Sequence, residues 1–132
     1  MKNIITSLLI FLFSSCYISS PKAKYSMKYA SFISVDSTKL SFGKIPCKKE
    51  KCSKSILCTN KSNKAIYISS IRAGCSCISY IYPKGIIKPE ETFSISIVYH
   101  TDTQKGFFYK RILVILNDGE FFYLLPITGT IQ

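Results

Sequence analysis

The sequence predicts an all-β protein built as an antiparallel β-sandwich of about seven strands. Short apolar runs alternate with polar residues, most clearly over residues 91–100, as expected for strands with one face in a core. No run beyond the N-terminal segment repeats its apolar residues with the 3.6-residue period of an amphipathic helix. The turn sequence Asn117-Asp118-Gly119 separates two apolar runs and is typical of a β-hairpin.

The expected strands follow one another at regular spacing, with turn residues between them. The first five are expected at residues 37–45, 53–60, 64–74, 79–83 and 91–100, and the last two on either side of residues 117–119. The fifth should place its alternate apolar residues in the core and its serines on the opposite face: Phe93, Ile95, Ile97 and Tyr99 against Ser94 and Ser96. About a hundred residues arranged in this way are enough for one independently stable domain.

The first sixteen residues resemble the signal of a bacterial lipoprotein. Lys2 precedes an apolar run at residues 4–13, which is too short to span a bilayer. Ser14 and Ser15 then lead into Cys16, the residue that would carry the lipid. The alternative is an ordinary secretory signal, because Phe13 stands where such lipoprotein signals usually have leucine. We therefore expect a signal peptide at residues 1–15, a tether at 16–35 and one domain at 36–132.

The charge and the signal together indicate the surroundings of the protein. The formal net charge is +11, from 18 lysines and arginines against 7 aspartates and glutamates. We expect a lipid-anchored protein of the bacterial cell envelope, facing the periplasm or the cell surface. Its partners would be the membrane and an envelope protein or anionic polymer, with no nucleic acid. A lysine-rich surface that is merely solvated is the simpler explanation of the charge.

Four short motifs carry a resemblance to a known family over residues 36–132. They are Phe42-Gly43, Thr59-Asn60, Cys75-Ser76-Cys77 and Thr128-Gly129-Thr130. Their order resembles the bacterial domain-of-unknown-function family 1573, which is similar to the immunoglobulin-like domains of the ASPM/SPD-2/Hydin group. The resemblance implies an immunoglobulin-like sandwich, often exported or lipidated, and implies no activity. Ser76 departs from the family pattern, which has glycine between the two cysteines.

The cysteines indicate export, because six in a short chain suit an oxidising compartment. Cys47 and Cys52 flank a four-residue turn, and facing positions of a hairpin lie within disulfide range. We expect a Cys47–Cys52 disulfide there. The alternative is two exposed thiols kept apart by the lysines between them.

The pair Cys75 and Cys77 allows either a structural or a chemical role. On an extended strand their α-carbons would be about 6.6 Å apart, so a direct disulfide needs a kink, which Gly74 could supply. Such a strained disulfide would be easily reduced, as redox-active disulfides are. Two thiolates side by side also suit copper or zinc, with Cys58 as a third ligand. The structural alternative joins one of the pair to Cys58 and leaves the other as a small buried hydrophobe.

An enzyme is not expected. His100 is the only histidine, and the acidic residues fall mostly in turns, where they are ordinarily solvated. The sequence contains no phosphate loop, nucleophile elbow or zinc-protease motif. A structural or binding role, for proteins or polymers, is the preferred hypothesis. Metal binding or redox chemistry at the cysteines is the alternative.

Overall fold

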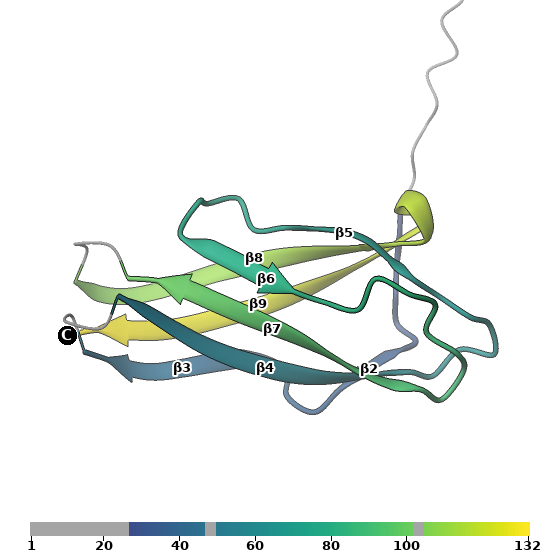
Figure 1. The fold of residues 1–132 in the computed structure, drawn as a ribbon, viewed down its shortest axis with the longest axis horizontal. Coiled ribbons are helices and arrows are strands. Elements are labelled where there is room, and N and C mark those ends of the chain that lie inside the picture. The colour runs from purple at the N-terminus through teal and green to yellow at the C-terminus, as the bar shows by residue number, and fades with distance from the viewer. Residues whose placement is uncertain (1–26, 47–49, 102–104) are drawn as a thin grey trace, which may run out of the picture.

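The protein is a sandwich of two β-sheets with an immunoglobulin-like arrangement (Figure 1). The structure is a computed structural model, and it describes residues 27–46, 50–101 and 105–132. Its strands, in chain order, are β1 (Lys28–Tyr29), β2 (Ile33–Val35), β3 (Leu40–Ile45), β4 (Lys51–Asn60), β5 (Ile68–Arg72), β6 (Ile78–Ile81), β7 (Thr92–His100), β8 (Gly106–Leu116) and β9 (Phe121–Ile131). A short 3-10 turn, η1 (Asn117–Gly119), joins the last two. The expected all-β sandwich is confirmed.

The strands divide into a five-stranded sheet and a four-stranded sheet. In the first, here called sheet A, the order is β1-β9-β8-β5, and β3 also pairs with β9. In the second, sheet B, the order is β2-β4-β7-β6. All pairs are antiparallel except β1 and β3, which run parallel to β9. Chain segments β5 and β6 follow each other directly but lie at the edges of different sheets, so the turn between them connects the two layers.

The described strands include two more than the sequence predicts, and both lie in the segment expected to be a tether. Strand β1 pairs with β9, strand β2 pairs with β4, and Ala30 between them is fully buried. The expected boundary at residue 36 is therefore too late, since the sandwich already includes residues 28–35. These strands are two and three residues long, too short for an alternating pattern to stand out. The proposed signal peptide and Cys16 lie outside the described residues.

The core forms between the sheets from the inward positions of the longer strands. As expected, Phe93, Ile95, Ile97 and Tyr99 of β7 are all buried. They pair across sheet B with inward positions of β4, where Ile56 and Cys58 are also buried. The third expected strand is shorter than residues 64–74, because regular pairing starts only at β5 and Ile66 makes a single bridge to Ile87.

The last two strands form the hairpin that the turn sequence predicts. Leu116 pairs with Phe121, and both Asn117 (φ 48°) and Asp118 (φ 54°) lie in the left-handed region. Asparagine and aspartate tolerate that region better than other non-glycine residues. The Asn117 side chain also accepts a hydrogen bond of 3.1 Å from the Tyr67 backbone N–H, which fastens the turn to the chain before β5.

One buried polar side chain, Asn60, explains the threonine-asparagine motif. Its amide donates to the carbonyl of Lys64 at 2.8 Å, and to those of Ile87 and Lys88 at 3.3 Å. Its side-chain oxygen accepts from the Ser62 backbone N–H and hydroxyl at 3.0 and 2.7 Å. The fully buried side chain thus forms hydrogen bonds with backbone groups of two loops, and it fixes the turn after β4.

Candidate functional site: the cysteine turn and the two outer faces

The turn between β5 and β6 carries the Cys75-Ser76-Cys77 motif. Cys75 and Cys77 are joined by a disulfide, and their α-carbons are 5.3 Å apart. Gly74, with φ +70°, supplies the kink that the sequence argument requires for a direct bridge. Both cysteines are partly buried against the core, and Ser76 between them is exposed. The disulfide therefore joins two residues of the same turn and links it to no other part of the chain.

The end of the sandwich beside this turn also carries Cys52 and His100. Cys52 pairs with Tyr99, which in turn pairs with Ile78 at the start of β6. The His100 backbone N–H donates to the Cys77 carbonyl at 2.7 Å, and its ring lies 2.9 Å from the Ser79 hydroxyl. Cys52 has no disulfide partner among the described residues. Cys47, its expected partner, lies outside them, so that disulfide stays a prediction.

Cys58 lies far from this end, contrary to expectation. It pairs with Phe93 and Val35, six positions along β4 from Cys52, or about 20 Å in an extended strand. Burial raises the pKa of its thiol to about 12, with a smaller contribution from the negative charge of Asp36. The expectation that Cys58 meets Cys75 and Cys77 is therefore wrong in this structure. Among the described residues, no three histidines, cysteines or acids cluster as metal ligands.

An aromatic cluster explains two further motifs near the cysteine end. The rings of Tyr99 and Phe108 stack with centroids 4.3 Å apart, and Phe42 lies 6.2 Å from Tyr99. Gly129 lies beneath them: a Cβ on it would be 2.5 Å from the Phe108 ring. Gly43 (φ +63°) sits where the pairing of β3 with β9 shifts register. These glycines are structural requirements of the sandwich end rather than parts of a binding loop.

The outer face of sheet B is lined with hydroxyl groups. We call it the hydroxyl face, and its side chains are Ser34 of β2; Ser53, Ser55, Leu57 and Thr59 of β4; Thr92, Ser94, Ser96 and Val98 of β7; and Ser79 and Ile81 of β6. Hydroxyls pair across the strands, Ser55 with Ser96 at 2.7 Å and Thr59 with Thr92 at 3.2 Å. Lys51, opposite His100, lies on the same face at the end of β4, and the other paired outward positions carry no charged side chain.

The outer face of sheet A is apolar instead. We call it the apolar face, and its apolar members are Phe107, Tyr109, Leu113 and Ile115 of β8 and Phe122, Leu124 and Pro126 of β9. Phe107 is 71% exposed and Tyr109 is 55% exposed. Three cations, Lys44, Arg72 and Arg111, occupy outward positions of the same sheet. This face could not be predicted from the sequence, because β8 and β9 carry apolar residues at both inward and outward positions.

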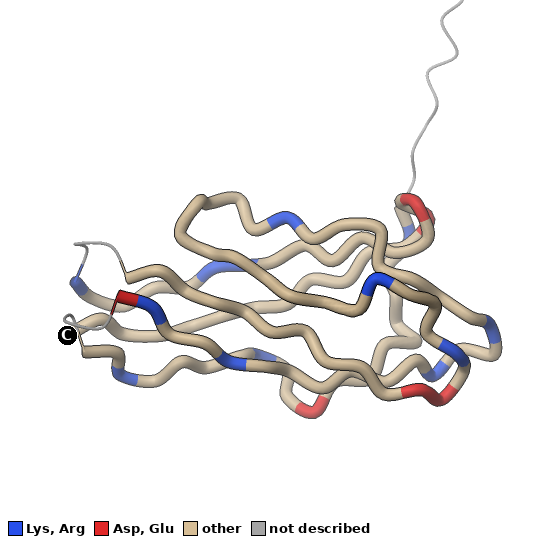
Figure 2. Tube along the Cα trace, viewed as in Figure 1, with Lys and Arg blue, Asp and Glu red and all other residues tan. Residues whose placement is uncertain are grey.

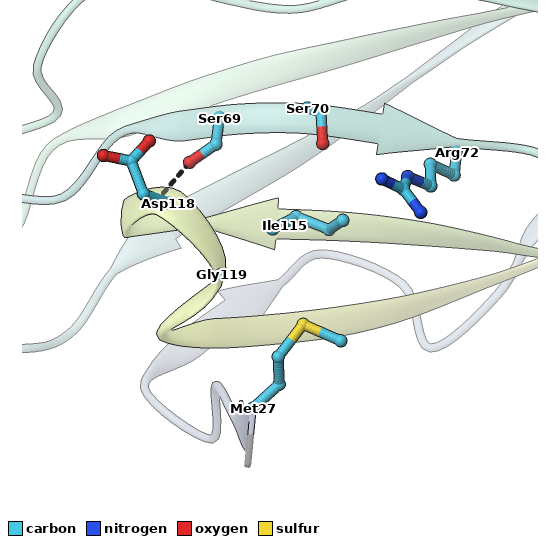
Figure 3. A pocket seen from close by; sticks show the side chains of 7 residues that line it. All are labelled: Met27, Ser69, Ser70, Arg72, Ile115, Asp118 and Gly119. Atoms are coloured by element: carbon cyan, nitrogen blue, oxygen red, sulfur yellow. Dashed lines mark hydrogen bonds between the residues drawn. The ribbon is translucent and has the colours of Figure 1, made fainter. Parts of the chain in front are cut away.

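A hollow of about 340 Å³ opens at one end of the apolar face (Figure 3). Met27, Arg72 and Ile115 line it, together with Ser69, Ser70, Asp118 and Gly119. The Asp118 backbone N–H donates to the Ser69 hydroxyl at 2.6 Å, which holds the hairpin turn against β5. Because Met27 shares this hollow with Ile115, the chain enters the sandwich on the side of the apolar face.

The described acidic residues lie outside the strands of both faces, and one of them, Asp118, lines the hollow at the end of the apolar face. Figure 2 shows them at the turns. One ion pair is present among the described residues, between Lys61 and Glu90 at 2.8 Å, and both side chains are well exposed. Such a pair contributes little to stability. No helix among the described residues is long and apolar enough to cross a membrane.

Comparison with known proteins identifies the fold and a family. The family model described as "Protein of unknown function (DUF1573)" matches residues 33–131. None of the curated proteins matches the sequence. Among solved structures, a protein of unknown function from Porphyromonas gingivalis W83 aligns with TM-score 0.62 and 16% identity, over 74% of this chain and 46% of the other.

Two other solved structures show how widely this fold is used. The VesB protease of Vibrio cholerae aligns with TM-score 0.55 and 13% identity, over 76% of this chain and 32% of that protein. PapD-like domain 7 of human CEP192, an ASH domain, aligns with TM-score 0.56 and 11% identity, over 76% of this chain and 85% of the domain. The chain thus spans less than half the length of the first two. At these identities the likeness establishes the fold alone.

Proposed function

Since the chain belongs to the DUF1573 family of immunoglobulin-like domains, we propose that it is a lipid-anchored module of the bacterial cell envelope with a structural or binding role. The observation that carries this proposal is the short distance between the lipoprotein-like cysteine and the sandwich. Only residues 17–26 separate Cys16 from Met27. Fully extended, that segment spans about 35 Å, so the anchor would hold the domain close to the bilayer.

Two further features support a binding module over an enzyme. The buried side chain of Asn60 fixes two loops, and the side chain of Asn117 fastens a hairpin turn, so both serve the fold. The two outer faces of the sheets differ in chemistry, and such broad surfaces are suited to contact with a large partner. An envelope protein or an anionic polymer would suit the net charge of +11.

Replacing Cys16 by Ser tests the anchor. Cells grown with radiolabelled palmitate should incorporate label into the parent chain and none into the Cys16→Ser variant. The Cys52→Ser variant is the matched control, since it removes a different thiol and should keep the label. If the Cys16→Ser chain is still labelled, the proposed anchor is wrong.

A second candidate function is thiol redox chemistry, favoured by the placement of the Cys75–Cys77 disulfide in a partly exposed turn. An external dithiol would pass two electrons and two protons to this bond and would itself become a disulfide. The copper or zinc alternative requires the reduced pair, because two thiolates must be available. Treating the folded chain with a dithiol should release two additional thiols by mass spectrometry. A chain that resists reduction until it unfolds would contradict this candidate.

A further inference from the structure

We propose that the apolar face of sheet A lies against an anionic lipid bilayer. This inference deepens the proposed function, because an anchored domain is held beside a membrane, but it concerns the sandwich itself and is tested without the anchor. The bilayer contact would add a second, protein-based attachment to the single lipid. It would also fix which side of the sandwich faces away from the membrane.

The composition of the face is the first argument. Phe107 and Tyr109 are largely exposed, and beyond Arg111 the half-buried Leu113, Leu124 and Phe122 add further apolar surface along β8 and β9. Aromatic side chains of this kind are favoured at the boundary between headgroups and acyl chains. Exposed apolar side chains gathered on one face of a single domain indicate a contact site.

The charge of the face is the second argument, and it selects the lipid. Lys44, Arg72 and Arg111 occupy outward positions of sheet A, whereas no acidic residue lies in any described strand. Long basic side chains can keep their charges at the headgroups while their stems lie on apolar surface. Cations arranged in this way are attracted to anionic headgroups.

The path of the chain is the third argument. Met27 lines the hollow that also contains Ile115 and Arg72, so the described chain begins on the side of the apolar face (Figure 3). The predicted lipid-bearing residue, Cys16, precedes Met27 by only eleven positions. A lipid at that position would hold the domain near the membrane by a segment that joins the sandwich beside the apolar face. This placement favours the bilayer over a soluble partner as the occupant.

Vesicle co-sedimentation tests the proposal in a chain that begins at position 16 and carries Cys16→Ser, so that no lipid is attached. We expect it to bind vesicles containing anionic phosphatidylglycerol and to bind neutral phosphatidylcholine vesicles at least about fivefold more weakly. The double variant Phe107→Ser/Tyr109→Ser should partition onto anionic vesicles at least about tenfold more weakly than the parent. The double variant Arg72→Gln/Arg111→Gln should lose binding to anionic vesicles only.

The matched control carries Leu57→Ser and Ile81→Ser, which remove two exposed apolar side chains from the hydroxyl face. This control should bind like the parent, and the thermal melting of every variant confirms that it is folded. No binding to anionic vesicles, or an equal loss in the control, would overturn the proposal. The proposal would also be overturned if the parent binds no vesicles but forms a dimer in analytical ultracentrifugation, and if Phe107→Ser/Tyr109→Ser dissociates that dimer. Palmitate labelling of the parent chain does not depend on any of these outcomes. A failure of the proposed lipid anchor can therefore be distinguished from a failure of the proposed contact between the apolar face and the bilayer.

Discussion

The two outer faces of this sandwich obey the same alternation but present opposite chemistry. On the hydroxyl face, the exposed positions of β4 and β7 are mostly serine and threonine, and their hydroxyls bond to one another across the strands. On the apolar face, the equivalent positions of β8 and β9 carry mostly phenylalanine, tyrosine, leucine, isoleucine and proline, beside Arg111, Thr128 and Thr130. Both sheets bury their inward residues in one shared core. The difference therefore cannot be a requirement of the fold.

What the difference teaches is where to look for function in a sandwich without an evident active site. Paired hydroxyls satisfy each other and keep the surface compatible with water. Exposing aromatic rings to water is unfavourable, so a group of exposed rings on one surface indicates a binding partner. The hydroxyl face does hold two exposed apolar residues, Leu57 (50% exposed) and Ile81 (68% exposed). They are separated by serines, whereas on sheet A Leu113 pairs directly with Leu124 and Ile115 pairs with Phe122.

The contrast between the two faces depends first on which residues of β7 point inward. One substitution tests that assignment. Ile95→Asp would place an unpaired charge between the sheets, where Ile95 is almost completely buried. The expected loss is more than about 4 kcal/mol of unfolding free energy, enough to abolish cooperative unfolding. The neighbouring change Ser94→Asp, on the hydroxyl face, should alter stability by less than about 0.5 kcal/mol. Thermal denaturation followed by circular dichroism measures both, and equal effects would mean that the assigned faces are wrong.

The apolar face depends in the same way on the register of β9, where Thr128 and Thr130 point outward and Gly129 inward. Gly129→Ala would bring a methyl group against Phe108, whose ring is already stacked on Tyr99. We expect a loss of about 2 kcal/mol, the usual cost of overpacking. Gly85→Ala is the control, since its added methyl group meets no atom within 4 Å. Chemical denaturation should separate the two variants, and a Gly129→Ala chain as stable as the parent would contradict the register of β9.

The inner side of sheet B supplies a smaller and pH-dependent test, because Cys58 is insulated from water. Its thiol has a pKa of about 12 in the folded chain, above its ordinary value of 9.0. Between these values the unfolded chain loses the proton while the folded chain keeps it, so stability falls as the pH rises. The loss should reach about 1.4 kcal/mol at pH 10 relative to pH 8.

Comparison with Cys58→Ala isolates this contribution from the other groups that titrate above pH 9. The variant should be less stable at pH 8 because it leaves a small cavity, but its stability should fall less steeply toward pH 10. Urea denaturation at the two pH values measures the slope. Identical slopes in the two chains would show that Cys58 is not shielded from solvent.

The cysteines show how far sequence reasoning reached toward the candidate site. The spacing of Cys75 and Cys77, with Gly74 before them, already indicated that a direct disulfide requires a kink, and the structure has that kink at Gly74. The placement of Cys58 could not be predicted, because its distance from the turn depends on how β4 and β6 register against β7. A one-dimensional pattern gives the face on which a residue lies but not its position relative to residues of another strand.

By itself, the sequence determined the fold class, the parity of β7 and the hairpin at Asn117-Asp118-Gly119, because alternation and turn chemistry are local properties. It also determined the family, through motifs whose physical reasons are now evident in Asn60 and Gly129. Only the tertiary structure decided that residues 28–35 belong to the sandwich, since β1 and β2 become strands by pairing with β9 and β4. Only the pairing of strands assigned the apolar residues of β8 and β9 to a core and to an exposed face. Those strands are apolar on both sides, so their sequence carries no alternation from which the outer side could be read.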